Sequence, residues 1–436
     1  MAAAVLYRSL QRLLRASAPA LAGRASTGAR GVVGRSRALP SLLEWARAER
    51  DRERPGAWLH APSVGEGLQA QAVLEALMRR RPALQATFTH FSPSAEALAG
   101  RVGAAWGGYL PWDLPDEMAL ALDAAAPGVV AFTKTEVWPV LVEEAARRGI
   151  PVAMVAGSVP PGAGRLRWPA RQLLRPTWAR VSLACAVGEA DGEGFRSLGV
   201  AEDAVRIVGD PGIDSAAART RHADPASAWL APFHAAVRPT VVAGSTWPSD
   251  LRVLLPALDT VRRHERGLRL IVAPHEPEPE VVRALLEELH RRGWRATALS
   301  EVEARGAGDV DAVVVERVGV LAQLYTLADV AYVGGGFHAA GVHSVLEPAA
   351  AGASVVFGPR RWNTRAAGDL LVSGAAREVQ DAAGMAGVLG EWVSDAAARA
   401  YAGRAARGYI HAHLGAADRT AALLDELLPS RPTPTR

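Results

Sequence analysis

Two carboxylates, Glu66 and Glu136, each stand a few residues after an apolar run that is typical of a buried strand. Transfer of a chemical group to a hydroxyl needs a base that removes the hydroxyl proton, and a carboxylate can be that base. Both acids are therefore candidates for proton transfer. The spacings Ser63-x-x-Glu66 and Thr133-x-x-Glu136 fit a helix capping box equally well, so the residues alone leave both interpretations open.

A glycine-rich segment, Gly334–Gly336, follows another apolar run in the second half of the chain. Glycines let the backbone approach a ligand closely, and a helix N-terminus attracts an anion. We expect a helix to start near Ser344, with Glu347 placed either to accept a hydrogen bond from a ribose or to cap that helix. The next strand end adds two arginines and an amide, and together these residues predict a site for an anionic nucleotide: Arg360, Arg361 and Asn363.

Two shorter loops in the same half carry small residues and one histidine. Ser245 and Thr246 follow one apolar run, and Pro274 and His275 follow the next. Small residues with free backbone N–H groups can hold a phosphate. His275 is a candidate contact for a nucleotide or phosphate, although a lone loop histidine is more often uninvolved.

The elements that would position these residues alternate between apolar runs and amphipathic stretches. Such alternation is typical of βαβ units with a parallel sheet, and it predicts an α/β protein. The expected strands are 57–61, 86–91, 129–133, 152–156, 181–187 and 205–208, then 240–243, 268–273, 312–315, 330–333 and 354–357.

An alanine-rich polar stretch at 216–234 interrupts the alternation and predicts a domain boundary. We expect two Rossmann-like domains that face each other across a cleft, with ligands at the carboxyl ends of the strands. GT-B glycosyltransferases have this architecture and so do sugar-nucleotide epimerases, so the fold does not fix the reaction. The predicted parts are a basic membrane-associating segment (1–38), an N-terminal domain (39–218), a C-terminal nucleotide domain (219–428) and a disordered tail (429–436).

The folded body of the chain is not basic, although the whole chain has a formal charge of +4. Residues 1–37 contain seven arginines and no acid, which leaves the other residues near −3. A nucleic-acid-binding domain carries its own basic patch, so nucleic acid is disfavoured as a partner. The single cysteine, Cys185, lies in an apolar run and is expected in the core, and the chain has no zinc-ligand spacing.

The basic segment predicts a short amphipathic helix. Such a helix lies in a lipid interface with anionic head groups, and no apolar run reaches the ~18–20 residues that span a bilayer. An arginine-rich start without acids also fits a mitochondrial transit peptide or a frayed tail, and these alternatives remain. Five apolar residues fall on one side (Val5, Leu6, Leu10, Leu13, Leu14) and three arginines on the other (Arg8, Arg12, Arg15).

The order and spacing of five short motifs resemble the Kdo transferase family, which moves 3-deoxy-D-manno-octulosonic acid (Kdo) from CMP-Kdo to a lipid A precursor. The resemblance runs from about residue 40 to about residue 425. Each motif alone is unspecific, and the ordered set carries the resemblance. The motifs are Ser63-Val-Gly-Glu66, Thr135-Glu-Val-Trp-Pro139, Gly244-Ser-Thr246, Leu346-Glu-Pro348 and Gly358-Pro359.

The resemblance implies a GT-B fold, no required metal or other cofactor, and catalytic roles for two residues: Glu66 as the general base and Glu136 in stabilising the transition state. It also implies that residues of three segments surround CMP: Pro274 and His275, then Gly319, Val320 and Leu321, then Ser344, Val345, Leu346 and Glu347. We expect further substrate contacts from Ser63, Gly65, Ser245, Thr246, Arg360 and Asn363.

Three positions depart from the family pattern. Ser344 stands where the family often has Asn, and His275 stands where it commonly has Arg. Gly212 stands where the family usually has a basic residue that helps with negative charge in the transition state, and Arg360 or Arg361 could replace that cation.

The expected function is inverting transfer of Kdo from CMP-Kdo to lipid IVA in lipopolysaccharide inner-core biosynthesis. The expected partners are CMP-Kdo, a lipid A precursor and, through residues 1–37, an anionic membrane surface at the cytoplasmic face of a Gram-negative inner membrane. The alternatives are another GT-B transferase or an epimerase that uses a UDP-sugar, and a catalytically inactive relative that binds nucleotide or lipid.

Overall fold

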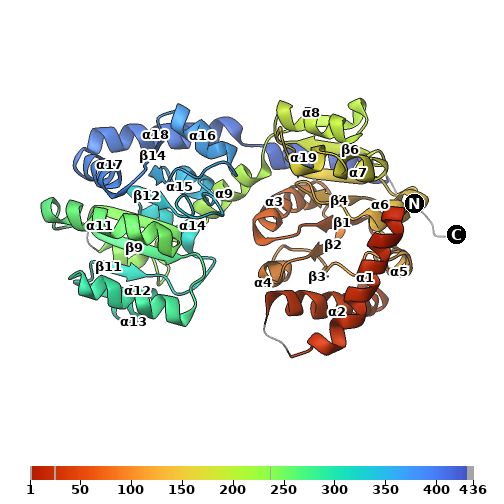
Figure 1. Ribbon diagram of the computed structural model, residues 1–436, viewed down its shortest axis with the longest axis horizontal. Helices are drawn as coiled ribbons and strands as arrows, with labels where there is room; N and C mark the ends of the chain where they lie inside the picture. Colours follow the sequence, from red (N-terminus) through yellow and green to blue (C-terminus); the bar gives the residue numbers. More distant parts are fainter. Residues whose placement is uncertain (1, 24–25, 236, 430–436) are drawn as a thin grey trace. The chain divides into compact units, whose positions relative to one another are not determined.

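The computed structural model describes residues 2–23, 26–235 and 237–429, and these form two compact units (Figure 1). Unit 1 is Met1–Ser215 with Leu414–Arg436, and unit 2 is Ala216–His413. The unit boundary lies three residues before the predicted boundary at 218. The last helix, which the sequence assigned to the C-terminal domain, packs in unit 1 instead. Most of the predicted disordered tail, residues 430–436, lies outside the described residues.

Unit 1 is built, in its described residues, on a seven-stranded parallel sheet in the order β3-β2-β1-β4-β5-β6-β7. The strands are β1 (Gly56–His60), β2 (Gln85–His90), β3 (Trp106–Tyr109), β4 (Val130–Thr133), β5 (Val152–Gly157), β6 (Leu183–Ala186) and β7 (Val205–Ile207). The helices are α1 (Ala2–Leu21), α2 (Thr27–Glu49), α3 (Val64–Arg80), α4 (Glu96–Ala99), α5 (Pro115–Ala125), α6 (Pro139–Arg147), α7 (Ala170–Trp178), α8 (Glu189–Leu198), α9 (Pro211–Arg221), which crosses into unit 2, and α19 (Ala416–Leu427).

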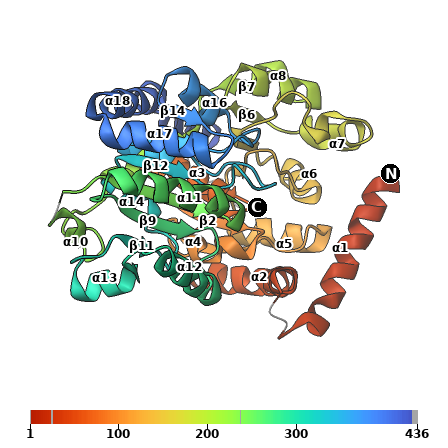
Figure 2. The same cartoon turned by 60° about the vertical axis from the view of Figure 1, so that its left-hand side comes forward.

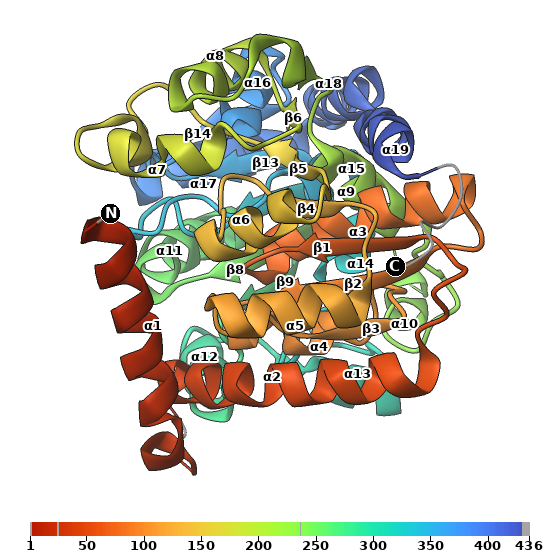
Figure 3. The same cartoon turned by 90° about the vertical axis from the view of Figure 1, so that its right-hand side faces the viewer.

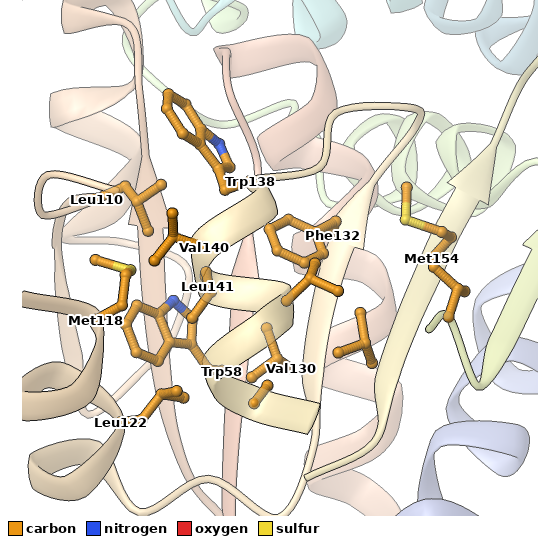
Figure 4. Packing of buried hydrophobic residues seen from close by; sticks show 14 of the residues in the cluster. Trp58, Leu110, Met118, Leu122, Val130, Phe132, Trp138, Val140, Leu141 and Met154 are labelled. Carbon is orange, nitrogen blue, oxygen red and sulfur yellow. The ribbon is translucent and has the colours of Figure 1, made fainter. Parts of the chain in front are cut away.

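The central strands of this sheet are apolar on both faces because helices cover both faces. Trp58, Phe132 and Met154 extend from β1, β4 and β5 toward α5 and α6 (Figure 4). On the other face, residues such as Leu59 and Val155 pack with α3 and α19. Strands buried on both sides read as continuous apolar runs, which is why the sequence predicted them.

Unit 2 repeats the design with the strand order β10-β11-β9-β8-β12-β13-β14, again all parallel in the described residues. The strands are β8 (Thr240–Thr246), β9 (Arg269–Pro274), β10 (Ala296–Ala298), β11 (Ala312–Val314), β12 (Val330–Val333), β13 (Ser354–Phe357) and β14 (Ala376–Glu378). The helices are α10 (Ala231–His234), α11 (Pro248–His264), α12 (Pro279–Arg291), α13 (Leu299–Arg305), α14 (Leu321–Leu324), α15 (Leu346–Ala351), α16 (Arg365–Val372), α17 (Ala382–Ser394) and α18 (Ala396–His413).

The two units confirm the predicted α/β class with two Rossmann-like sheets. Three strands that the sequence did not predict, β3, β10 and β14, stand at sheet edges. Edge strands are short and half solvated, so they lack a continuous apolar run. The predicted cleft between the domains stays a prediction.

The N-terminal segment forms two helices that fold onto unit 1. In α1, Tyr7 donates a hydrogen bond to Asp113 at 2.8 Å, Arg8 pairs with Glu143 at 2.9 Å, and Arg15 lies 3.2 Å from Glu117. Helix α2 packs along α5 and β3 (Figure 3). Across the described residues, no helix is both long enough and apolar enough to cross a bilayer.

Candidate active site

The two carboxylates singled out in the sequence line one pocket of unit 1. Strands β1 and β4 are parallel neighbours, so the loops that follow them meet at the same edge of the sheet. Glu66 stands in the first turn of α3 after β1, and Glu136 stands in the loop between β4 and α6. The pocket has a volume of about 240 Å³, and its lining also includes Lys134, Thr135 and Arg165.

Glu66 does not cap its helix. Ser63 is the N-cap residue of α3, but its side chain makes no cap hydrogen bond to the backbone. The Ser63 hydroxyl donates instead to the Glu66 carboxylate, and the Lys134 ammonium lies 3.6 Å from the same carboxylate. The Glu66 side chain is 18% exposed and faces the pocket, so it is placed to accept a proton from a bound hydroxyl.

Glu136 is also not used for capping. The N-cap of α6 is Trp138, two residues later, and the Thr133 hydroxyl donates to the carbonyl of His60. A carboxylate oxygen of Glu136 lies 3.5 Å from Nε2 of His60. The carboxylate is 34% exposed and lines the pocket.

His60 is held in one tautomer below Glu136. Trp138 donates its indole N–H to Nε2 of His60 at 3.1 Å, so Nε2 is an acceptor and the proton is on Nδ1. Nδ1 then donates to the Thr89 hydroxyl at 3.0 Å, which also accepts the indole N–H of Trp58 at 2.8 Å. With Nε2 used as an acceptor, His60 does not donate a hydrogen bond from this nitrogen to Glu136, which lies 3.5 Å away.

A buried arginine from α2 supports the Glu136 loop. The Arg35 guanidinium stacks 4.7 Å from the Trp138 ring and 4.3 Å from the Trp112 ring, and it donates to the carbonyl oxygens of Leu110 and Pro111. Burial lowers the pKa of Arg35 to about 10, which still leaves it protonated at neutral pH. The sequence placed Arg35 in the basic membrane segment, because residue type alone does not distinguish a buried arginine from an exposed one.

Asp113 anchors the start of α6, the helix that follows Glu136. Its carboxylate accepts the backbone N–H groups of Val140 at 3.0 Å and Leu141 at 2.8 Å, together with the Tyr7 hydroxyl. Burial raises the pKa of Asp113, and these three donors oppose that shift. Asp113 was not predicted as a site residue from the sequence, although an acid within the segment Tyr109-Leu-Pro-Trp-Asp-Leu-Pro115 is a signal that could have indicated it.

The glycine-rich loop of unit 2 is organised by the buried acid Asp250. Asp250 stands in the first turn of α11 and accepts the backbone N–H groups of Trp247 and Gly335 at 2.8 Å each. It also accepts the Phe337 N–H at 3.2 Å and the Tyr332 hydroxyl at 2.8 Å. This carboxylate therefore joins the end of β8 to the end of β12, and the sequence did not single it out.

Two of the loop glycines are required by neighbouring backbone. A Cβ on Gly334 would lie 2.1 Å from the Ser245 carbonyl oxygen, and a Cβ on Gly336 would lie 2.4 Å from the Gly358 nitrogen. The close approach of neighbouring backbone segments thus explains why these positions are glycine, without any ligand. Asn363 ties the same loop down, because its amide donates to the carbonyl oxygens of Ala340 and Val342.

The helix that contains Glu347 does not begin where the sequence predicted. Helix α15 begins at Leu346, two residues after the expected Ser344, with Val345 as the N-cap. The Glu347 carboxylate pairs with Arg219 of α9, so the Ser344-x-x-Glu347 capping box does not form. The short helix explains the error, since six residues give a weak periodic signal.

An aromatic cluster gathers at the ends of β8 and β9. The Trp247 ring stacks on His338 with centroids 3.9 Å apart and on His275 at 4.5 Å, and its N–H donates to His343 at 3.2 Å. Burial lowers the pKa of His275 and lowers that of His343 to about 4, so both rings are neutral at neutral pH. His275, which stands where the related family commonly has Arg, therefore supplies a ring here without a positive charge.

The remaining predicted substrate residues fall at the same two strand-end edges. Pro274 ends β9, the His275 N–H donates to the Thr246 carbonyl at 3.0 Å, and Ser245 has a left-handed φ of 52°. Leu321 reaches β8, since its side chain lies 2.7 Å from where a Cβ on Gly244 would be. In unit 1, a Cβ on Gly65 would meet no atom within 4 Å. Gly319 and Val320 precede α14, Val345 is the N-cap of α15, and the Arg360 N–H donates to the Gly336 carbonyl at 3.0 Å.

Gly212, the position without the family's basic residue, lies at the start of α9 in unit 1. Its N–H donates to Asp210 at 2.7 Å, and the Gln69 amide donates to the same carboxylate oxygen at 2.9 Å. Burial raises the pKa of Asp210. Arg361, one of the two arginines predicted to replace the family's cation, pairs with Glu378 at 2.7 Å. The pocket of Glu66 and Glu136 is lined instead by the cations Lys134 and Arg165.

The two parallel sheets with their helices define a class of fold, the two-domain GT-B-like fold. The chain is similar to a UDP-N-acetylglucosamine 2-epimerase from Neisseria meningitidis, with a TM-score of 0.58 and 12% identity over 85% of this chain and 99% of that one. It is also similar to a glycosyltransferase from Rickettsia africae, with a TM-score of 0.57 and 10% identity over 86% of this chain and 98% of that one. At such identities these likenesses show the fold and leave the reaction open.

Sequence similarity is more specific. Residues 37–215 match the model of the 3-deoxy-D-manno-octulosonic-acid transferase (kdotransferase) family. The 3-deoxy-D-manno-octulosonic acid transferase of Bordetella pertussis is 29% identical over 85% of this chain and 87% of its own length. That of Haemophilus influenzae is 26% identical over 71% of each chain. The chain is thus similar in sequence to the Kdo transferase family.

A metal site was not expected. Within residues 2–23, 26–235 and 237–429, no group of three or more His, Cys, Asp or Glu side chains is arranged to hold a metal ion. The prediction that transfer needs no metal or other cofactor remains a prediction.

Proposed function

We propose that this protein is an inverting glycosyltransferase that moves Kdo from CMP-Kdo to lipid IVA in lipopolysaccharide inner-core biosynthesis. The observation that carries this proposal is the pocket in which Glu66 and Glu136 face the same space, with neither carboxylate used for helix capping. The similarity to Kdo transferases supports Kdo as the sugar, and the pocket contains groups suited to its transfer.

In the proposed reaction, Glu66 takes the proton of an acceptor hydroxyl as the hydroxyl oxygen attacks the anomeric carbon of Kdo. The bond from that carbon to the CMP phosphate oxygen breaks, and CMP leaves with the electron pair. A single displacement inverts the anomeric centre. Lys134 lies 3.6 Å from Glu66 and, with Glu136, sets the charge of the pocket in which the transition state forms.

We place donor binding in unit 2, at the carboxyl ends of β8, β9 and β12. The loops that meet there bring together Thr246, His275 and the glycine loop 334–336. The predicted CMP contacts at 319–321 and 344–347 flank the same edge, where Leu321 reaches β8 and Val345 precedes α15.

CMP is expected to stabilise unit 2 and UDP is not. A ligand at 100 times its Kd adds about 2.7 kcal/mol of stability, which is roughly 5–10 °C in Tm for a unit of about 200 residues. The measurement is thermal unfolding of the full protein with CMP, CTP, UMP or UDP. Stabilisation by UDP with no response to CMP would overturn the donor assignment and favour a UDP-sugar enzyme.

The N-terminal helix is proposed to attach the protein to the cytoplasmic face of the inner membrane. Its arginines Arg8 and Arg15 pair with acids of α6 and α5, so they face the protein. Its leucines face outward, with Leu6 73% and Leu13 69% exposed. An outward apolar face on a helix held by ion pairs is suited to insertion below lipid head groups.

Replacing Leu6, Leu10 and Leu13 by Ser is expected to weaken vesicle binding at least tenfold, because burying each leucine contributes roughly 1.5–3 kcal/mol. The measurement is co-sedimentation of the full protein with phosphatidylglycerol-containing vesicles. A matched control replaces Val318 and Val372, exposed apolar residues of unit 2, by Ser. Equal binding of the leucine variant and the wild type would refute the attachment through α1.

A further inference from the structure

A second exposed surface of unit 1 combines arginines with large apolar side chains. It lies on the segment 164–176, which contains the start of α7, and we call it the Trp168 surface. It consists of the exposed residues Arg167, Trp168, Arg171, Leu173 and Arg175. We propose that this surface binds an anionic lipid bilayer, as a contact separate from helix α1.

The first argument is charge. No acidic residue occurs between Glu144 and Glu189, while this stretch contains seven arginines. In the part of the chain that the structure describes, Arg167, Arg171 and Arg175 make no ion pair, unlike Arg8 and Arg15 of α1. Unpaired exposed arginines on a segment without acids give a local positive field that attracts anionic head groups.

The second argument is the apolar content of the same surface. Trp168 is 79% exposed and Leu173 is 55% exposed. Tryptophan is favoured at membrane–water interfaces, because its ring is apolar and its N–H is polar. The opposite side of the segment is fixed in the core by Trp178, which is fully buried, and by Leu174. The exposed residues therefore stand on a rigid base.

The third argument is position within unit 1. Helix α7 packs against α6, and α6 is joined to α1 by the Arg8–Glu143 ion pair. Figures 2 and 3 show α1, α6 and α7 on one side of unit 1. The exposed leucines of α1 and the Trp168 surface thus flank the same helix, and one bilayer surface can contact both.

The fourth argument links the surface to the pocket. Arg165 and Leu174, which belong to the same segment, line the pocket that contains Glu66 and Glu136, and Arg165 donates to the carbonyl of Thr135. Under the proposed function, a bilayer bound at the Trp168 surface would present a lipid-anchored acceptor at the rim of that pocket. An anionic bilayer fits both components, because its head groups attract the arginines and its interfacial region accommodates Trp168 and Leu173.

The test uses the full protein with vesicles of phosphatidylcholine, with and without phosphatidylglycerol, and contains neither CMP-Kdo nor acceptor. Its outcome is therefore independent of the proposed glycosyl transfer. Replacing Arg167, Arg171 and Arg175 by Gln should lower binding to anionic vesicles about fivefold for each arginine, at about 1 kcal/mol each. The matched control replaces Arg252, Arg266 and Arg404 of unit 2, which are exposed and make no ion pair among the described residues, and should bind as the wild type does.

A site-specific readout locates the contact. Trp168→Cys, labelled with an environment-sensitive fluorophore, should shift its emission to the blue when anionic vesicles are added, because the only native cysteine, Cys185, is buried. Trp362→Cys, at an exposed tryptophan of unit 2, is the control and should not shift. A protein that sediments with vesicles without a shift at position 168 would overturn the proposal. So would equal vesicle binding by the two arginine variants. Binding of the surface to a soluble polyanion without a vesicle-induced shift would assign it to an acidic macromolecule instead.

Discussion

Replacing Glu66 by Gln is expected to slow Kdo transfer by about 10²–10⁴-fold, the usual contribution of a positioned general base. Glutamine has the same shape, and its amide oxygen can still accept the Ser63 hydroxyl, so the loop and α3 should keep their structure. It cannot accept the proton of the attacking hydroxyl. The measurement is kcat with CMP-Kdo and lipid IVA.

The matched control is Glu75→Gln, an exposed acid nine residues further along the same helix, whose carboxylate accepts a hydrogen bond from Gln71. That variant should retain the wild-type rate and stability. A Glu66→Gln protein that transfers Kdo at a near wild-type rate would exclude Glu66 as the base.

Replacing Asp250 by Ala is expected to destabilise unit 2 by several kcal/mol and to abolish CMP binding. The change leaves three backbone N–H groups and the Tyr332 hydroxyl without their acceptor. Each buried donor left without a partner costs about 1–3 kcal/mol. The measurements are denaturant unfolding and CMP titration.

Two comparisons separate the role of Asp250 from a general effect of removing an acid. Asp309→Ala, at an almost fully exposed position of unit 2, should change stability by less than about 0.5 kcal/mol. Tyr332→Phe removes one donor and leaves the acceptor in place, so its effect should be small. If Asp250→Ala were as stable as Asp309→Ala, the assigned role of Asp250 would be wrong.

The central strands could be predicted because burial on both faces leaves a direct trace in the sequence. Residues 330–333 are apolar in succession, and the predicted range equals β12. Strand β3, Trp106–Tyr109, contains two glycines and is partly exposed, and β10 and β14 are three residues each. Their pairing depends on the neighbouring strand more than on their own residues, so their residues carry no periodic signal.

The candidate site residues could be named from the sequence, but their arrangement in space could not. Spacing alone left Glu66 and Glu136 divided between catalysis and capping, and the structure excludes capping because both helices begin without help from these carboxylates. The pairing of β1 with β4 brings the loops of Glu66 and Glu136 together. This strand order cannot be predicted from the residues of either loop. Their catalytic roles stay predictions.

Some side chains could not have been identified from sequence because their partners are remote in the chain. Arg35 meets Trp112 and Trp138, which are more than 70 residues away. Asp250 meets the glycine loop, which is 85 residues away at Gly335. Gly334 and Gly336 were predicted to let a ligand approach the backbone. In the structure these positions are glycine because the backbone of Ser245 and Gly358 leaves no room for a Cβ.

The central claim is that the pocket of Glu66 and Glu136 serves Kdo transfer, and product formation tests it most directly. Purified full-length protein is incubated with CMP-Kdo and lipid IVA, and the acceptor is examined by mass spectrometry while released CMP is quantified. We predict that the acceptor gains Kdo, that one CMP appears for each Kdo added, and that both signals fall together in Glu66→Gln. A folded wild-type protein that binds CMP and forms no Kdo-bearing product would contradict the account.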